Sequence, residues 1–207
     1  MNRKLNVPNT LSLIRVILTF VFMITAIVFD MCGLPIWTRL IPTAIFGLAA
    51  FTDFLDGKIA RAKNLITDFG KFIDPLADKF MVFGACITFL VIDPHTAHVF
   101  VWVSALVILR ELAVTSMRLV VSSQSGIVIA ASFFGKCKTV IQIVTLLVMF
   151  LEPVFAWLAG LCNLAPVATF FGYSVLSYVL MAAMGLVTLA SGIDYLRAYM
   201  PHIDTNK

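Results

Sequence analysis

The feature that most limits how this chain can fold is a series of long apolar runs, separated by short polar or Pro/Gly-containing segments. Of its 207 residues, 61% are hydrophobic and only 13% are charged. A helix needs about 20 apolar residues to cross the hydrocarbon core of a bilayer, which leaves room here for about six crossings. The predicted helices are 8–29, 37–61, 71–92, 97–122, 136–158 and 166–198. We therefore predict an all-α, polytopic membrane protein with six transmembrane helices and a single domain over residues 1–207.

The polar segments differ in charge, and this difference predicts an orientation. Alternate segments hold most of the cations, namely Arg3, Lys4, Arg61, Lys63, Lys71, Arg118, Lys136, Lys138, Arg197 and Lys207. Arg39 is nearly alone on the other side, where Asp30, Asp93 and Glu152 are expected as solvated acids. Because Lys and Arg are enriched in cytoplasmic loops, both termini are predicted to be cytoplasmic.

Four aspartates lie between residues 53 and 78. At about 100° per residue, Asp53 and Asp56 share one helical face, and Asp74 and Asp78 share a face of the next helix. Carboxylates near an apolar layer cost about 2.5 to 3.5 kcal/mol each on insertion scales, so cations are expected among them. Carboxylate oxygens suit Mg²⁺ or Mn²⁺, and four acids are enough to hold two ions for phosphoryl chemistry. The alternative is a set of salt bridges with the neighbouring Lys58, Arg61, Lys71 and Lys79.

Small residues accompany the first two acids. Gly57 and Ala60 lack bulk on the same helical face, so a large ligand such as a nucleotide can approach the backbone there. Arg61, one turn after Gly57, can pair with a phosphate. This part of the chain is thus suited to the head of a nucleotide-linked substrate.

The order Asp53-x2-Asp56-Gly57-x2-Ala60-Arg61-x8-Gly70-x3-Asp74-x3-Asp78 resembles the CDP-alcohol phosphotransferase signature at every fixed position. The resemblance implies that Asp53, Asp56 and Asp74 bind metal, whereas Asp78 contacts the second ion and is the general base. A positioned carboxylate beside a metal is what a weakly nucleophilic hydroxyl needs. The resemblance also implies a site for the CDP-lipid, formed by Asn9, Thr10, Asp56, Gly57, Ala60 and Arg61. Asn9 and Thr10 could instead cap the first helix.

A second polar group follows in the fourth and fifth predicted helices. Glu111, Thr115 and Arg118 share one helical face, with Arg110 beside it. The fifth helix opens with cations, and a helix N-terminus attracts anions. These residues predict a pocket for an acceptor that already carries a phosphate, formed by Arg118, Lys136, Lys138, Arg110 and Gln142. The alternatives are a buried ion pair of Arg110 with Glu111, and lysines that serve only as topology anchors.

The acceptor segments and the opening Asn6 to Arg15 resemble the bacterial phosphatidylglycerophosphate synthase branch of the same family. That resemblance implies transfer of a phosphatidyl group from CDP-diacylglycerol to glycerol 3-phosphate at the cytoplasmic side of a bacterial-type inner membrane. A homodimer among membrane lipids is expected, with no nucleic acid as partner. Three alternatives stay open: another acceptor such as inositol phosphate or serine, an intramembrane prenyltransferase, and a cation transporter.

Overall fold

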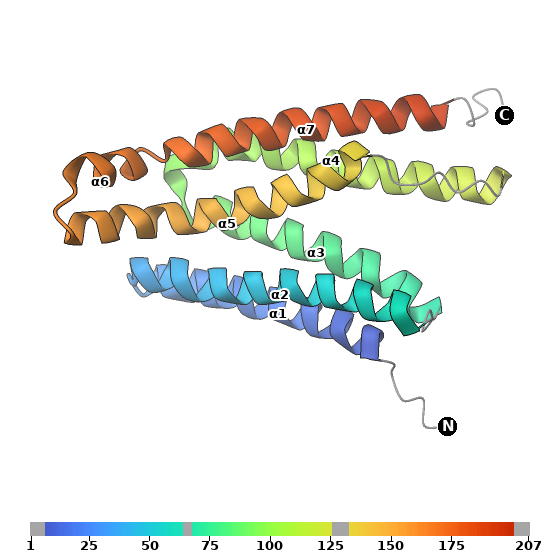
Figure 1. Cartoon of the computed structure of the whole chain (residues 1–207), viewed down its shortest axis with the longest axis horizontal. Coiled ribbons are helices and arrows are strands. Elements are labelled where there is room, and N and C mark those ends of the chain that lie inside the picture. Colours follow the sequence, from blue (N-terminus) through green and yellow to red (C-terminus); the bar gives the residue numbers. More distant parts are fainter. Residues whose placement is uncertain (1–6, 64–67, 126–132, 201–207) are drawn as a thin grey trace.

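A computed structural model describes residues 7–63, 68–125 and 133–200, without the side chains of residues 7–8, 53–63, 68, 71 and 122–125. Its helices are α1 Val7–Met31, α2 Pro35–Lys63, α3 Asp68–Ile92, α4 Pro94–Ser125, α5 Phe133–Leu161, α6 Ala165–Gly172 and α7 Val175–Tyr199. The long helices lie lengthwise in one bundle (Figure 1). The end at which α1 begins and α7 ends is called the terminal end, and the opposite end, which holds α6, is called the far end.

The all-α prediction is confirmed for the described part of the chain, and the first five predicted helices lie within a few residues of α1 to α5. The prediction of one helix over 166–198 is wrong, because the chain breaks between α6 and α7. Ser174 has a left-handed backbone conformation, with φ of 54°, which a helix cannot continue through. In the turn between α1 and α2, Gly33 has the same left-handed conformation, with φ of 67°, which is not strained in glycine because it has no Cβ atom.

Glu152 of α5 explains where α7 begins. Its carboxylate accepts hydrogen bonds from the backbone N–H groups of Leu176 at 2.9 Å and Ser177 at 2.8 Å, and from the Ser177 hydroxyl. These N–H groups lie in the first turn of α7, where no preceding helical carbonyl can accept them. Glu152 is 0% exposed, so the expectation of a solvated acid at this position is wrong. A negative charge at a helix N-terminus is favourable, which stabilises the buried carboxylate.

Replacing Glu152 with alanine should therefore destabilise the far end. The change leaves two backbone N–H groups and one hydroxyl buried without their acceptor, at a cost of about 2 kcal/mol or more. Thermal unfolding of the purified protein in detergent should show a lower midpoint. Asp30→Ala is the control, because Asp30 is an exposed acid at the same end. Equal midpoints for the two variants would contradict the capping role.

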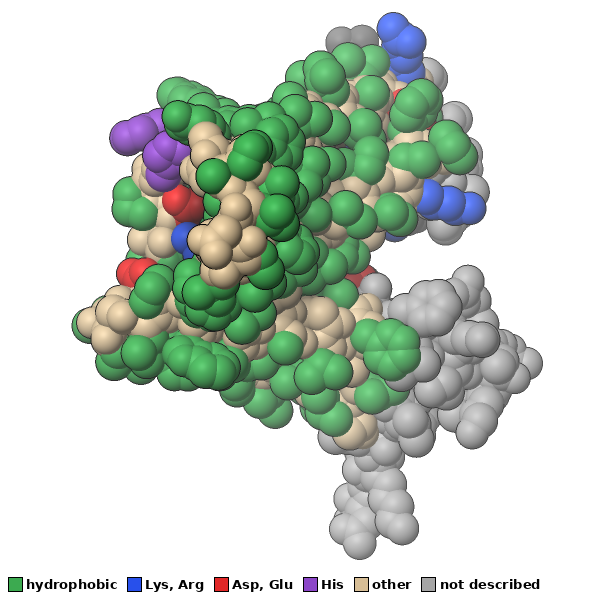
Figure 2. Space-filling model, turned by 60° about the vertical axis from the view of Figure 1, so that its left-hand side comes forward, with side chains coloured by type: hydrophobic (Ala, Val, Ile, Leu, Met, Phe, Trp, Pro, Cys, Tyr) green, Lys and Arg blue, Asp and Glu red, His purple; other side chains and the backbone are tan. Residues whose placement is uncertain are grey.

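Most of the described helices suit a membrane. Five stretches are long and apolar enough to cross one: Asn9–Met31, Phe72–Ile92, Pro94–Val121, Phe133–Leu161 and Ala165–Tyr199. Figure 2 shows hydrophobic side chains over much of the described surface on one face, with few charged or His side chains among them. This exposed apolar surface is costly in water and matches lipid tails, so the chain is a multi-pass membrane protein.

An aromatic chain forms the centre of the bundle. The ring of Phe22 on α1 lies 5.7 Å from Phe46 on α2 and 5.5 Å from Phe150 on α5. Phe150 in turn lies 5.4 Å from Phe89 on α3, which lies 5.2 Å from Phe100 on α4. Tilted and edge-to-face pairs of this kind contribute about 0.5 to 1.5 kcal/mol each beyond area burial. They hold five helices in a fixed arrangement beneath the polar residues of the terminal end.

Helices α1 and α3 approach closely at Gly84. A Cβ atom at this position would lie 2.8 Å from Cγ2 of Thr19. Thr19 cannot easily move, because its hydroxyl donates to the carbonyl of Arg15 at 2.9 Å. The small residue thus lets the two backbones pack tightly, as in many membrane helix pairs. The close crossing places the polar first half of α1 against the acids of α3.

Candidate functional site

Two of the four predicted acids are held by side chains of α1. The Ser12 hydroxyl donates to Oδ1 of Asp74 at 2.5 Å, and the Arg15 guanidinium donates to Oδ1 of Asp78. Arg15 is 0% exposed, whereas the side chain of Asp78 is 51% exposed. Ser12 and Arg15 are roughly one turn apart on α1, as Asp74 and Asp78 are on α3. The two helices therefore hold both carboxylates at set positions, with Asp78 still accessible.

A cavity of about 320 Å³ opens beside these acids. Its described lining comes from α3, α4 and α5: Asp74, Pro75, Asp78, Lys79, Val82, Glu111, Arg118, Lys138, Thr139 and Gln142. The sequence predicted Asp74 and Asp78 as one group, and Arg118, Lys138 and Gln142 as another. The structure brings the two groups together in one cavity, with Asp74 and Asp78 on the α3 wall, Arg118 on the α4 wall and Lys138 on the α5 wall. We call it the acid–cation cavity.

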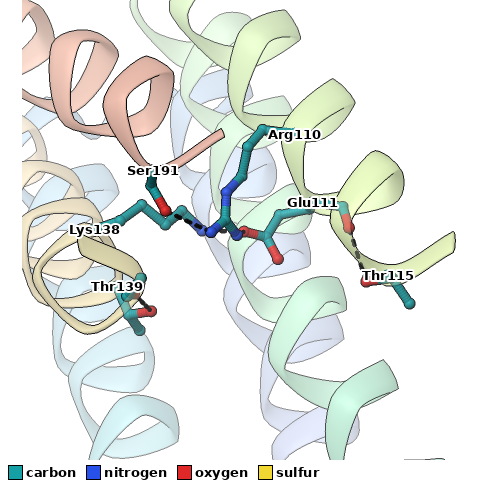
Figure 3. Close-up of polar contacts among 7 residues, drawn as sticks. Arg110, Glu111, Thr115, Lys138, Thr139 and Ser191 are labelled. Carbon is teal, nitrogen blue, oxygen red and sulfur yellow. Dashed lines mark hydrogen bonds and ion pairs between the residues drawn. The ribbon is translucent and has the colours of Figure 1, made fainter. Parts of the chain in front are cut away.

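Glu111 joins two cations in the wall of this cavity (Figure 3). Its Oε1 accepts from Nη1 of Arg110 at 2.9 Å and from Nζ of Lys138. Arg110 also donates from Nη2 to Ser191 of α7 at 2.6 Å, and its Cζ lies 5.1 Å from the Tyr195 ring centroid. Two cations share one carboxylate, so this network has a net positive charge. The predicted pair of Arg110 with Glu111 is present. Lys138 joins the same carboxylate, which the sequence did not suggest.

Gln142 lines the acid–cation cavity although it is 1% exposed. Its Nε2 has no hydrogen-bond partner among the described residues. An unpaired buried amide donor costs about 1 to 3 kcal/mol, and a ligand acceptor in the cavity would remove that cost. Lys138 is also largely buried, with its charge beside the same space.

A second cavity, of about 270 Å³, adjoins the first. It shares Lys79, Glu111, Arg118 and Thr139 with the acid–cation cavity. It also includes Arg110 and Lys136, the remaining two residues of the predicted acceptor pocket. All five predicted acceptor residues thus lie along two adjoining cavities.

The rest of the predicted site is only partly described. The side chains of Asp53, Asp56, Ala60 and Arg61 and the surroundings of Gly57 are not described, although the backbone of this segment continues α2. Asn9 is buried and Thr10 exposed. Both lie inside the first turn of α1, so neither is the residue that precedes the helix. Among the described residues, no three or more His, Cys, Asp or Glu side chains come together as a metal site.

Sequence reasoning did not assign Ser12, Arg15, Lys79 or Thr139 to the site. Arg15 had a usable signal, because a lone arginine in an apolar membrane helix is expensive and normally has a functional partner. Lys79 directly follows Asp78, and the sequence suggests it only as a salt-bridge partner. Serine and threonine gave no such signal, because they commonly bond to their own helix in membrane proteins. Thr139 does so in this structure, donating to the Gly135 carbonyl at 3.2 Å.

The site can bind a multiply charged anion next to carboxylates. Cations on two walls can hold phosphate oxygens, and the unpaired amide of Gln142 adds a donor. The accessible carboxylate of Asp78 can accept a proton or a metal ion from the same space. Such an arrangement suits transfer between two phosphorylated substrates.

Comparison with known proteins agrees with this chemistry. The family model described as CDP-alcohol phosphatidyltransferase matches residues 5–190. A Bacillus subtilis protein named CDP-diacylglycerol--glycerol-3-phosphate 3-phosphatidyltransferase is 40% identical over 154 residues, covering 71% of this chain and 77% of that protein. A Mycobacterium tuberculosis protein named probable phosphatidylglycerophosphate synthase is 35% identical, and the match covers 93% of this chain and 81% of that protein. A Pseudomonas fluorescens protein, which has the same name as the Bacillus subtilis protein, is 30% identical, and the match covers 98% of this chain and 94% of that protein.

Proposed function

Because the chain belongs to the CDP-alcohol phosphatidyltransferase family, we propose that it transfers the phosphatidyl group of CDP-diacylglycerol to glycerol 3-phosphate. The products are phosphatidylglycerol phosphate and CMP. The observation that carries this proposal is the acid–cation cavity, which is lined by Asp74 and Asp78 of α3 together with Arg118 of α4 and Lys138 of α5. The names of the similar proteins support the same pair of substrates.

The cationic walls are proposed to bind the phosphate of the acceptor. Arg118 is exposed in the cavity, and no ion pair or hydrogen bond joins its side chain to the rest of the described structure. Its guanidinium is therefore available to a phosphate monoester, for which two parallel N–H donors are well suited. Lys138, Lys136 and Arg110 add charge around the same space, and Gln142 donates to an acceptor oxygen. Glu111 supplies only one negative charge to Arg110 and Lys138, so an uncharged acceptor would leave the net positive charge of this group uncompensated.

Asp78 is proposed to take the proton from the acceptor hydroxyl. Arg15 holds one carboxylate oxygen from the α1 side, which restricts the rotation of the side chain and directs it at the cavity. The freed alkoxide attacks the phosphorus that links diacylglycerol to CMP, a P–O bond to the acceptor forms, and the P–O bond to CMP breaks. CMP leaves with the bonding electrons, while Asp78 keeps the proton until solvent removes it.

Proteins of this family generally depend on a divalent metal ion, and two acids of the described part of the chain could contribute ligands to one. Asp74 and Asp78 supply carboxylate oxygens one turn apart, which are hard ligands preferred by Mg²⁺ and Mn²⁺. Asp53 and Asp56 are proposed as the other ligands, for two ions in all. A bound ion would neutralise charge on the phosphate oxygens of the CDP-lipid. Asn9, Thr10, Asp56, Gly57, Ala60 and Arg61 are proposed to hold that substrate.

The proposed orientation places the site at the cytoplasmic face of a bacterial inner membrane. Arg118, Lys136, Lys138 and Arg197 all lie in the terminal half of the bundle, and cytoplasmic ends are rich in Lys and Arg. Both chain termini would then be cytoplasmic, with α2 as the sixth crossing. The homodimer expected from the resemblance is a proposal that mass measurement in detergent tests.

The proposed reaction is tested by CMP release from the purified protein in detergent. CDP-diacylglycerol and Mg²⁺ or Mn²⁺ are supplied with glycerol 3-phosphate, inositol phosphate or serine in parallel reactions. We expect turnover with glycerol 3-phosphate, none with serine, and loss of turnover on chelation with recovery when metal is restored. Turnover with inositol phosphate instead would contradict the proposed acceptor, and failure to release CMP with any acceptor would contradict the proposed chemistry.

A further inference from the structure

A third cavity, of about 460 Å³, lies between α3 and α4. Three of its lining side chains, Phe72, Leu76 and Leu119, are large, apolar and exposed. The cavity is therefore an open groove on the outer surface of the bundle, and an apolar surface of this kind faces lipid tails in a membrane. We call it the α3–α4 groove.

Two cations form the inner wall of this groove. Lys79 of α3 and Arg118 of α4 line it, and both also line the acid–cation cavity. Neither side chain forms an ion pair or hydrogen bond with another part of the described chain. Phe72 begins one membrane-crossing stretch, and Arg118 and Leu119 lie close to where another ends at Val121. Arg118 therefore lies near the level of lipid headgroups, and Lys79, about two turns inside its stretch, can extend its long side chain toward that level.

We propose that the α3–α4 groove binds an anionic membrane phospholipid. Its phosphate contacts Lys79 and Arg118, and an acyl chain lies against Phe72, Leu76 and Leu119. Cations at the headgroup level attract anionic lipids, and the apolar wall binds the attached chain. Both parts of the groove are needed for this ligand, since a free phosphate would leave the apolar wall unused.

The charges of the groove favour a lipid over a second copy of the chain. In a two-fold symmetric contact the same surface patch meets itself, so Lys79 and Arg118 would approach their own counterparts. No acidic residue lines the groove in the described part of the chain to balance them. Like charges brought together at a desolvated interface are unfavourable, whereas a lipid phosphate neutralises them.

Lipid retention measured by native mass spectrometry tests the proposal without any substrate. The purified protein is mixed in detergent with equal amounts of phosphatidylglycerol and phosphatidylcholine. We expect selective retention of phosphatidylglycerol, reduced about fivefold by Lys79→Gln, which removes one cation near the headgroup. Leu119→Trp fills the groove without changing the charge of the groove, and it should also reduce the retention of phosphatidylglycerol. Arg197→Gln and Leu112→Trp are matched controls, because both residues are exposed and neither lines a described cavity.

The outcomes separate the possible ligands. Equal retention of both lipids, or equal loss in the control variants, would show nonspecific association and overturn the proposal. Displacement of phosphatidylglycerol by inorganic phosphate, together with unchanged retention in Leu119→Trp, would assign the cations to the acceptor alone. Retention that disappears when the chain dimerises would assign the groove to a second copy. Because CMP release is not part of this measurement, its result does not depend on the proposed reaction.

Discussion

Asp78→Asn is expected to lower the rate of CMP release by about a thousandfold, which is the scale of a positioned general base. Asparagine has nearly the same shape, and its carbonyl oxygen can still accept the hydrogen bond from Arg15. It cannot take a proton from the acceptor hydroxyl, and it is a weaker metal ligand. Binding of CDP-diacylglycerol should be reduced much less than turnover. Both quantities are measured on the same preparation, by CMP release and by equilibrium binding of the CDP-lipid.

Two other variants show whether the loss of CMP release is specific to the change at Asp78. Asp30→Asn removes an exposed acid from the far end and should leave the rate unchanged. Arg118→Ala should raise the KM for glycerol 3-phosphate more than it lowers kcat, if the guanidinium contacts the acceptor phosphate. An Asp78→Asn rate within tenfold of the unchanged protein would refute the proposed base.

Glu111→Gln should have the largest effect on stability of any change near the site. Glu111 is the shared partner of Arg110 and Lys138, and the side chain of Lys138 is only 6% exposed. Removing the charge leaves two neighbouring buried cations without a counterion, at a cost of about 3 kcal/mol. Thermal unfolding in detergent should show a clearly lower midpoint. Added glycerol 3-phosphate should raise the midpoint of this variant more than that of the unchanged protein, because its phosphate supplies the missing negative charge.

A double-mutant cycle separates the ion pair from ordinary packing. Adding Lys138→Met to Glu111→Gln removes one of the two unpaired cations and should restore part of the lost stability. Lys136→Met is the control, since Lys136 is exposed on the same helix and should give no such rescue. If Lys138→Met is simply additive with Glu111→Gln, the proposed network does not stabilise the protein.

The helices could be predicted because membrane insertion depends on long apolar runs, and these are visible in one dimension. Five of the six predicted helices correspond to α1 to α5. The break between α6 and α7 was not predictable in the same way. Its N–H groups are satisfied by Glu152, 24 residues earlier in the chain, so the local sequence around Ser174 does not show what stabilises the new helix.

The residue types of the site were also evident from the sequence, but their grouping was only partly so. Asp74 and Asp78 share a face because helical spacing is fixed, and the same holds for Glu111 and Arg118. That α3 meets α4 and α5 at these positions depends on packing of the whole bundle, including the aromatic chain through Phe89 and Phe150. The two cations joined by Glu111 come from different helices, and helical spacing says nothing about such a pair.

The sequence by itself determined that this chain is a helical membrane protein of the CDP-alcohol phosphatidyltransferase family, because apolar run length and motif spacing are local properties. Only the tertiary structure decided that Arg15 from α1 contacts Asp78, that Lys138 is paired with Glu111, and that Lys79 and Arg118 also face the α3–α4 groove. These contacts join residues far apart in the chain. They exist because close helix packing, as at Gly84, fixes which faces meet.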